Sequence, residues 1–291
     1  MSEKRPVGLV VGETAELPLS FREKHSIEEA LFDVYFLEDE DRDKARKDFF
    51  QKMRKGWHPK TAQPSVGTYL RAYKKALKNF EEIIVITMTS ELSGAFDSAN
   101  RAVGHLEEDE QKRASVFDSR LVSIGEGLFC WKTQELIDQG LSAERIRAAL
   151  YSLKDEIQLF GLLKNVRWLE EGGRISPSKA KAAKMAQKLG GFTAVTIEHG
   201  KVEKAGALGM KFSSKGMVPA VLKELEKVTI TKSVEGNLMQ VAITHADIET
   251  RELEELKNGL AHLGIRALFV SQITPVLGTY AGPGAILVAY I

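Results

Sequence analysis

The first half of the chain alternates short apolar runs with stretches of helical periodicity. Two runs, Val7–Val11 and Ile83–Met88, are continuous and rich in β-branched residues, which is typical of strands buried on both faces. Apolar positions over Thr68–Phe80 recur at helical spacing. The same reading predicts a helix opening at Ser93, a strand at Ser115–Phe117, and helices over 124–139 and 143–155. This alternation predicts an α/β fold whose N-terminal domain has a mostly parallel, doubly wound sheet.

The second half combines its elements differently. Strands are expected at 159–163, 193–198 and 201–207, with His199-Gly200 as a tight turn between the last two. Helices are expected over 177–188, 213–227 and 249–263, and short strands at 239–244, 267–271 and 285–290. The charge-rich residues 40–55 predict a solvated helix face. We therefore expect a smaller α+β C-terminal domain and place the two domains at 1–155 and 156–291.

Composition narrows the class of protein. The chain has 291 residues, of which 43% are hydrophobic and 28% charged, as in an ordinary globular protein. Its 41 Lys+Arg nearly balance 40 Asp+Glu, so no general affinity for nucleic acid or anionic membranes is indicated. Cys130 is the single cysteine, and no Cys or His cluster has the spacing of a metal site. We also expect no signal peptide and no membrane span, and therefore a cytoplasmic protein.

Most common catalytic motifs are missing. The sequence has no phosphate-binding loop, no G-x-S-x-G elbow and no H-E-x-x-H. Gly125-Glu126-Gly127 begins a dinucleotide-binding pattern, but Cys130 stands where its third glycine would be and the stretch lies within a predicted helix. His245 follows a predicted strand, where a structural role is favoured over that of a catalytic base. No cofactor is therefore expected.

Two hydroxyl-bearing segments lie where ligands commonly bind. Ser93-Gly94-Ala95 follows a buried strand and begins a helix, and ligands of parallel sheets bind at the carboxyl ends of strands. Free N–H groups at such a helix start attract anions, and Gly94 would allow a ligand to approach the backbone. The alternative is that Ser93 only caps the helix. The stretch Thr61–Ser65 precedes another helix, and helix entry accounts for Pro64 and Ser65 but not for Thr61.

Two further segments are candidates. Gly278–Gly284 is expected to form a tight loop before the last strand, in which Tyr280 either packs or meets a ligand. Arg174 follows a glycine pair, and Arg167 and several lysines lie nearby in the sequence. These basic residues form either a docking patch for an acidic partner or a solvated helix face.

In their order and spacing, these segments resemble the DegV family, in particular the fatty-acid-binding subunits of bacterial fatty acid kinase. The stretch Thr61–Ser65 is similar to the family's Thr-Ser-Gln-Pro-Ser with Ala62 as the one change, and Ser90–Ala95 is similar to its Ser-x-x-Leu-Ser-Gly-Thr. Leu169–Ser176 matches its Leu-x-x-Gly-Gly-Arg-Ile-Ser, and Asp118-Ser119 matches its Asp-Ser. The resemblance covers nearly the whole chain.

The resemblance implies the two-domain EDD fold, with one long-chain fatty acid such as palmitate held between the domains. It implies that Thr61 and Ser93 bind the carboxylate. We expect the Gly94 and Ala95 backbone and Tyr280 to assist, and apolar residues of the second domain to line the tail. It also implies that a separate kinase subunit phosphorylates the bound acid to acyl phosphate, so that the binding subunit is not itself an enzyme. Arg174 and Arg167 are the candidate docking residues for that subunit.

The chain departs from the family pattern at several positions. Tyr280 stands where the family has a histidine, and Val11–Thr14 replaces its Thr-Asp-Ser near the first strand. The family's Lys-Pro is not evident around Phe192–Val195. These departures leave open a lipid sensor or interaction protein that never meets a kinase. A hydrolase with Ser93 as nucleophile is a third hypothesis, but no spacing supplies its base.

Overall fold

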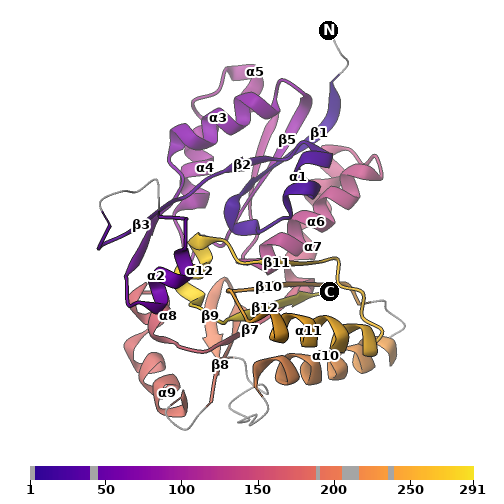
Figure 1. Cartoon of the computed structure of the whole chain (residues 1–291). Coiled ribbons are helices and arrows are strands. Elements are labelled where there is room, and N and C mark those ends of the chain that lie inside the picture. The colour runs from indigo at the N-terminus through magenta and orange to yellow at the C-terminus, as the bar shows by residue number, and fades with distance from the viewer. Residues whose placement is uncertain (1–3, 40–44, 188–190, 205–215, 235–238) are drawn as a thin grey trace. The chain divides into compact units, whose positions relative to one another are not determined.

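The structure is a computed structural model that describes residues 4–39, 45–187, 191–204, 216–234 and 239–291. The chain divides into two compact units. Unit 1 contains residues 1–33, 61–157 and 199–201, and unit 2 contains residues 34–60, 158–198 and 202–291. Each unit is built around its own sheet (Figure 1).

The sheet of unit 1 has four strands in the order β2-β1-β5-β6, and every neighbouring pair is parallel. These strands are β1 (Arg5–Gly12), β2 (Glu28–Ala30), β5 (Phe80–Thr87) and β6 (Ala114–Asp118). The apolar run in β5 is buried from Ile83 onward, because helices cover both faces of the sheet. The parallel α/β fold predicted for this part of the chain is confirmed.

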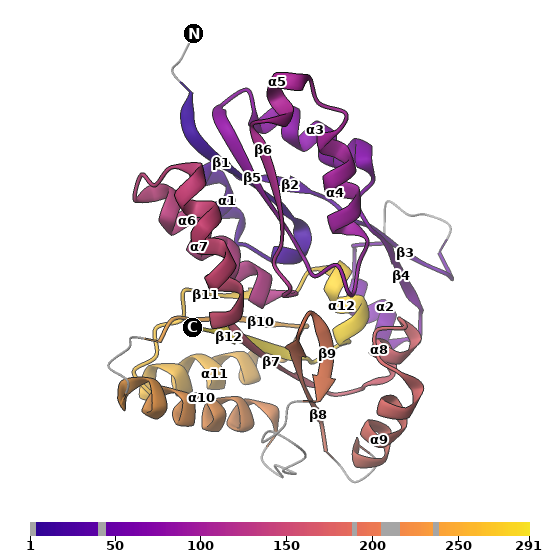
Figure 2. The same ribbon diagram turned by 180° about the vertical axis from the view of Figure 1, so that it is seen from behind.

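Helices α3 and α4 cover one face of this sheet, and α6 and α7 cover the other (Figure 2). The helical elements of unit 1 are η1 (Glu13–Ala15), α1 (Leu19–His25), α3 (Val66–Ala76), α4 (Ala95–Val103), α5 (Glu108–Gln111), α6 (Ile124–Asp138) and α7 (Ala143–Glu156). On the first face, Tyr69 and Tyr73 of α3 pack with Ala99 of α4 against Val85. Ser142 caps α7, since its hydroxyl oxygen accepts a hydrogen bond from the Arg145 N–H.

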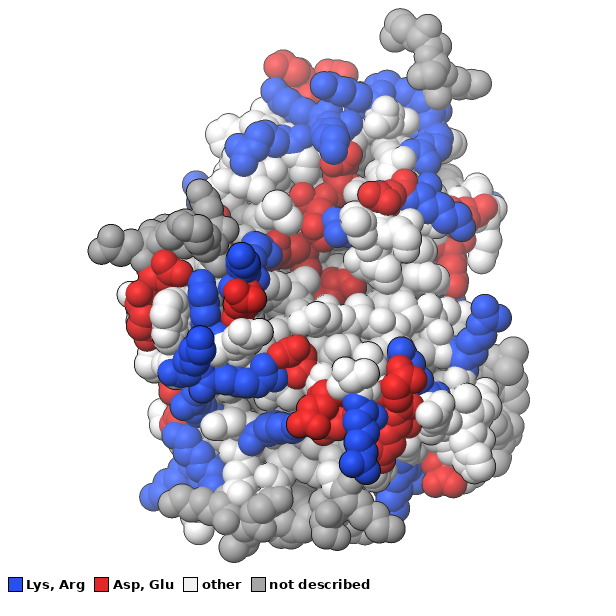
Figure 3. Space-filling model, viewed as in Figure 1, with Lys and Arg blue, Asp and Glu red and all other residues white. Residues whose placement is uncertain are grey.

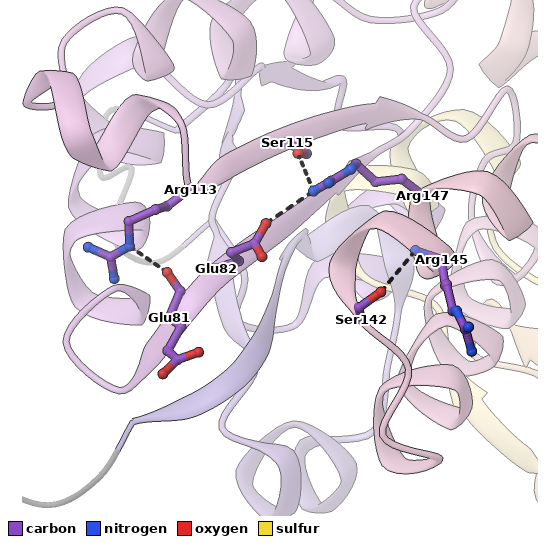
Figure 4. Close-up of polar contacts among 7 residues, drawn as sticks. All are labelled: Glu81, Glu82, Arg113, Ser115, Ser142, Arg145 and Arg147. Atoms are coloured by element: carbon purple, nitrogen blue, oxygen red, sulfur yellow. Dashed lines mark hydrogen bonds and ion pairs between the residues drawn. The ribbon is translucent and has the colours of Figure 1, made fainter.

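Polar contacts secure the amino ends of β5 and β6 (Figure 4). Arg147 of α7 forms an ion pair with Glu82 at 3.1 Å and donates to the Ser115 hydroxyl at 3.4 Å. The Arg113 guanidinium donates to the Glu81 carbonyl at 2.5 Å. Because these contacts lie near the starts of the strands, they fix the sheet at the end opposite to the loops that follow β5 and β6.

Unit 2 contains a six-stranded sheet in the order β11-β10-β12-β7-β8-β9. Its strands are β7 (Gln158–Leu163), β8 (Thr193–Glu198), β9 (Lys201–Lys204), β10 (Val241–His245), β11 (Phe269–Gln272) and β12 (Ile286–Tyr290). The pair β10–β11 is parallel, whereas β10–β12, β12–β7 and β7–β8 are antiparallel. His199 and Gly200 connect β8 to β9, both with positive φ, which is the geometry of the predicted two-residue turn.

Helices α10 and α11 pack on one face of the six-stranded sheet through an aliphatic core. In that core, Val221 and Leu225 of α10 and Leu256 of α11 contact residues such as Ile243 and Val288. The helices of this part are α2 (Phe49–Arg54), α8 (Arg167–Glu171), α9 (Pro177–Gln187), α10 (Met217–Val234), α11 (Thr250–His262) and α12 (Pro275–Ala281). A separate two-stranded sheet pairs β3 (Asp33–Phe36) with β4 (Pro59–Ala62).

In the described residues 45–55, the charged side chains Arg46, Lys47, Asp48, Arg54 and Lys55 are exposed, as a solvated helix face requires. The apolar residues Phe49, Phe50 and Met53 of α2 are buried, so the segment is amphipathic. One local prediction is corrected. The expected loop over 278–284 is helical in its first half, since α12 runs to Ala281 with Pro275 at its start. The expected strand over 201–207 and the expected start of α10 extend into residues 205–215, which lie outside the described residues.

The division expected at 155/156 differs from the two units in one large segment. Residues 34–60 group with unit 2, although they precede most of unit 1 in the sequence. Packing of Phe50 explains part of this grouping. Its ring lies so close to Gly278 of α12 that a Cβ on this glycine would stand only 2.9 Å from the ring. Such packing joins residues that are far apart in the chain. A domain boundary predicted from composition along the sequence therefore does not detect it.

Candidate functional site

The loop between β5 and α4 in unit 1 is held by hydrogen bonds from both of its sides. At its start, the Thr89 N–H donates to the Leu121 carbonyl at 2.8 Å. The Asp118 carboxylate, at the carboxyl end of β6, accepts from the Ser90 N–H at 3.2 Å and from the Ser90 hydroxyl at 2.6 Å. The neighbouring strands β5 and β6 thus position this loop at the edge of the sheet where ligands commonly bind.

Ser93 lies just outside helix α4. The N-cap of α4 is Gly94, so the interpretation of Ser93 as the N-cap is wrong. Its hydroxyl oxygen accepts a hydrogen bond from the Ala95 N–H at 3.2 Å, and the residue is half-buried. That bond uses the oxygen as acceptor and leaves the hydroxyl hydrogen to donate to an anion. Ala95 therefore contributes its N–H to orienting Ser93.

The segment around Thr61 reaches the same helix through Gln63. The Gln63 side-chain amide donates from Nε2 to the Gly94 carbonyl and to the Ser98 hydroxyl, each at 3.1 Å. Thr61, at the end of β4, is half-buried and lies two residues before Gln63. The structure therefore brings the two predicted hydroxyl-bearing segments to the amino end of α4. Ser65 has the capping role expected of it, since its oxygen accepts from the Thr68 N–H at 3.1 Å.

Tyr280 belongs to α12 in unit 2 and packs among residues of that unit. The Arg174 guanidinium lies over its ring, with 4.5 Å between the guanidinium carbon and the ring centroid. A Cβ on Gly172 would stand 2.5 Å from Cδ1 of the same ring. Gly172 and Arg174 come from one glycine-rich segment, and the Tyr280 ring therefore packs against this segment. The phenol of Tyr280 remains a predicted assistant in carboxylate binding.

The basic residues around Arg174 are partly neutralised. Lys184 forms an ion pair with Glu170, and Lys179 pairs with Glu203 at 2.6 Å. Arg167 places its guanidinium over the Trp168 ring, 4.0 Å from the centroid. Lys and Arg side chains gather over α8 and α9 on the face shown in Figure 3, with acidic side chains among them. The patch is therefore less positive than the sequence indicated.

A hollow of about 460 Å³ lies in unit 2 between α2 and the segment before α12. Its charged lining comes from Arg46, Asp48 and Asp247, and Arg54 forms an ion pair with Asp247. Phe49 and Phe50 also contribute to its walls. Because covering charged side chains with hydrocarbon removes them from water at a cost, this hollow does not suit an acyl tail.

Glu126 was not predicted from the sequence to be a site residue. It lies in the first turn of α6 and is fully buried. Burial raises its pKa well above the ordinary value, and the nearby charges of Glu16 and Asp118 raise it further. The sequence did contain a signal for a buried carboxyl, namely an acidic residue between two glycines at an otherwise apolar helix start. In the sequence analysis this stretch was interpreted only as a partial dinucleotide-binding motif.

The described residues show no hydrolase arrangement at Ser93. The hydrogen bond found for its hydroxyl comes from the Ala95 N–H, and no histidine is hydrogen-bonded to it in the described parts. His245 lies in unit 2, where burial lowers its pKa and its Nδ1 has no hydrogen-bond partner among the residues that the structure describes. Among the described residues no acidic, His and Cys side chains group as metal ligands, and no helix is long and apolar enough to cross a membrane.

Comparison with known proteins gives concordant results in sequence and in fold. The family model described as "Uncharacterised protein, DegV family" matches residues 6–291. Protein DegV of Bacillus subtilis is 26% identical, covering 96% of this chain and 97% of its own. A DegV domain-containing protein of Staphylococcus aureus is 28% identical over 78% of this chain and 76% of its own.

Solved structures share the fold at lower sequence identity. A stearic-acid-binding protein of Eubacterium ventriosum has a TM-score of 0.84 at 21% identity, covering 99% of this chain and 98% of that one. A DegV family protein of Thermus thermophilus, described for its fatty acid binding, has a TM-score of 0.79 at 23% identity, covering 98% and 99%. These similarities confirm the two-part α/β architecture over the length of the chain.

Proposed function

Because this chain belongs to the DegV family, we propose that it binds one long-chain fatty acid, such as palmitate, without covalent chemistry. One observation carries the proposal. Gln63 joins the segments of Thr61 and Ser93 at the amino end of α4. Solved relatives of the same fold are described as binding fatty acids, among them stearic and heptadecanoic acids.

The carboxylate would be bound by hydroxyl hydrogens. Ser93 accepts a hydrogen bond from the Ala95 N–H, so its own hydroxyl is polarised toward donation. Thr61 would supply the second hydroxyl, and the Gly94 backbone at the helix start adds a positive partial charge. Each charge-assisted hydrogen bond contributes about 1.5–3 kcal/mol. Two such bonds offset much of the cost of removing a carboxylate from water without an arginine or a metal ion.

The tail supplies most of the affinity. Each buried methylene contributes about 0.8 kcal/mol, so the roughly 14 methylenes of palmitate contribute about 11 kcal/mol before the entropic costs of binding. Loss of the head-group hydroxyls should therefore weaken binding and relax its preference for acids without abolishing contact with the chain.

The second part of the proposal concerns transfer. The protein would present the bound carboxylate to a separate kinase subunit, which forms the acyl phosphate, and would itself catalyse nothing. Arg174 and Arg167 are the proposed docking residues for that subunit. A sensor that binds lipid without such transfer is the second candidate, and Tyr280 favours it, because a tyrosine is neutral near pH 7 where the family's histidine can carry charge.

The binding proposal is tested by native mass spectrometry of the freshly purified protein. We expect one bound species with the mass of a fatty acid in the wild type and a smaller amount of it in the double variant Thr61→Ala, Ser93→Ala. Thr231→Ala is a matched control, because this exposed hydroxyl donates to the Lys227 carbonyl within α10. Equal lipid in the wild type and the double variant would overturn the assignment of these residues.

The transfer proposal requires a second assay, in which a cognate kinase and ATP are added to the loaded protein. Acyl phosphate production would support the carrier, and its absence would favour the sensor. The charge reversal Arg174→Glu should abolish transfer while the bound lipid is retained. If transfer continues unchanged in this variant, Arg174 is not a docking residue.

A further inference from the structure

The Gln63 side chain bridges two segments that are far apart in the sequence. Its Nε2 atom donates one hydrogen to the Gly94 carbonyl and the other to the Ser98 hydroxyl, both over 3.1 Å. A primary amide has two such donors, and this arrangement uses both. The contact joins residues separated by 31 positions in one case and 35 in the other.

The Gln63 bridge requires glycine at position 94 because a larger side chain would occupy the space of the Gln63 amide. The backbone conformation at this position does not itself require glycine. Its φ is −77°, which is in the ordinary range for any residue. A Cβ at this position would stand 2.5 Å from Oε1, 2.7 Å from Nε2 and 2.9 Å from Cδ of Gln63. The space that the sequence suggested for a ligand is occupied by the Gln63 amide.

The bridge connects the two residues proposed to bind the head group. Thr61 precedes Gln63 by two residues, and Ser93 immediately precedes Gly94. The other end of the loop is held separately, by Asp118 through Ser90. Asp118 secures the start of the loop, and Gln63 provides a direct contact between the Thr61 segment and the Ser93 segment.

We infer that Gln63 is a positioning residue, whose amide sets the spacing between the Thr61 and Ser93 hydroxyls so that one carboxylate can meet both. The inference rests on the proposed function, because it assigns Gln63 a role in the same head-group site. It makes Gln63 responsible for the preference for an acid over an uncharged head group. Gln63 is exposed, so it contributes little to the hydrophobic core.

A purely structural role for Gln63 makes a different prediction. If the amide only stabilised the loop, its loss would weaken binding of every ligand with the same tail by the same factor. A positioning role concerns the charged head group alone. Comparing palmitate with its methyl ester separates the two, because the ester has the same acyl chain and no negative charge.

The test measures dissociation constants of palmitate and methyl palmitate for the wild type and for Gln63→Leu, by displacement of a fluorescent fatty acid. Leucine keeps similar bulk and removes both donors. We expect palmitate to bind about tenfold more weakly, the equivalent of about 1.4 kcal/mol, and the ester to bind within about twofold of the wild type. Gln139→Leu, at an exposed glutamine at the end of α6, is the matched control and should change neither constant.

A second variant keeps the test informative if Gln63→Leu folds poorly. Ser98→Ala removes one of the two acceptors and leaves Gln63 in place, so it should weaken palmitate binding by a smaller factor and leave the ester unaffected. Unchanged palmitate binding, or equal weakening of acid and ester, would overturn the inference. A wild type that binds neither ligand would instead refute the proposed function.

Discussion

Replacing Glu126 by glutamine should change the way in which stability depends on pH. Glu126 is fully buried on α6, and desolvation raises its pKa well above the ordinary value. The charges of Glu16, Asp118 and Glu29 act in the same direction, whereas the hydroxyl of Thr14 lowers the pKa in part. The folded protein therefore keeps a proton on this carboxyl at pH values where the unfolded chain has released it.

The sign and size of the effect follow from this proton uptake. An exposed glutamate ionises near pH 4.3, so above about this value folding must bind a proton. Stability then falls as pH rises, by up to about 1.4 kcal/mol per pH unit, until the folded carboxyl also ionises. Glutamine is similar in shape and does not titrate. The stability of Glu126→Gln relative to the wild type should therefore increase with pH at up to the same slope.

Urea unfolding of the whole chain at pH values from about 5 to about 8 measures this difference, since the midpoint and slope give the free energy of unfolding at each pH. Glu156→Gln, at an exposed position at the end of α7, is the control and should differ from the wild type by an amount that does not change with pH. A Glu126→Gln difference that is flat across this range would refute the reasoning, because a buried carboxyl that gains a proton on folding cannot give a flat result.

Two further substitutions test local packing and surface charge. Gly172→Ala should destabilise the protein by about 1–3 kcal/mol in urea unfolding, because the added Cβ would stand 2.5 Å from the Tyr280 ring; an unchanged midpoint would show that the ring moves aside freely. Arg147→Ala should cost less than about 1 kcal/mol, since its ion pair with Glu82 is about a third exposed. It should also leave fatty acid binding unaltered in a displacement assay, and a loss of affinity would contradict the separation of this contact from the site.

Several features were predictable from the sequence because they depend on near neighbours. The apolar run at Ile83–Met88 predicted a buried strand, and β5 covers most of it. Ser65 and Ser142 cap the helices that follow them, since a cap requires only a hydroxyl and the next N–H groups. The His199-Gly200 turn has the same local origin, because both residues accept positive φ more readily than most.

Part of the site could also be located in this way. The sequence predicted Thr61 and Ser93 as site residues because Ser93 follows a predicted strand and begins a helix, and Thr61 lies in a segment that precedes another helix. Their assignment as ligands remains a prediction. The sequence did not indicate what fills the space beside Gly94, because a side chain from any distant segment can occupy it, and here that side chain is Gln63. Ligand binding by the Gly94 backbone remains a prediction.

The alternation of apolar and polar residues thus determined the order of strands and helices and the parallel sheet, since each of these is specified by periodicity along the chain. Tertiary structure alone decided the contacts between distant segments. It joined Gln63 to Gly94, buried Glu126 inside unit 1 and placed the charge-rich segment around Phe50 against α12. The physical reason is that burial and side-chain hydrogen bonds depend on what lies nearby in space, and no local pattern records neighbours that are 31 or more residues away.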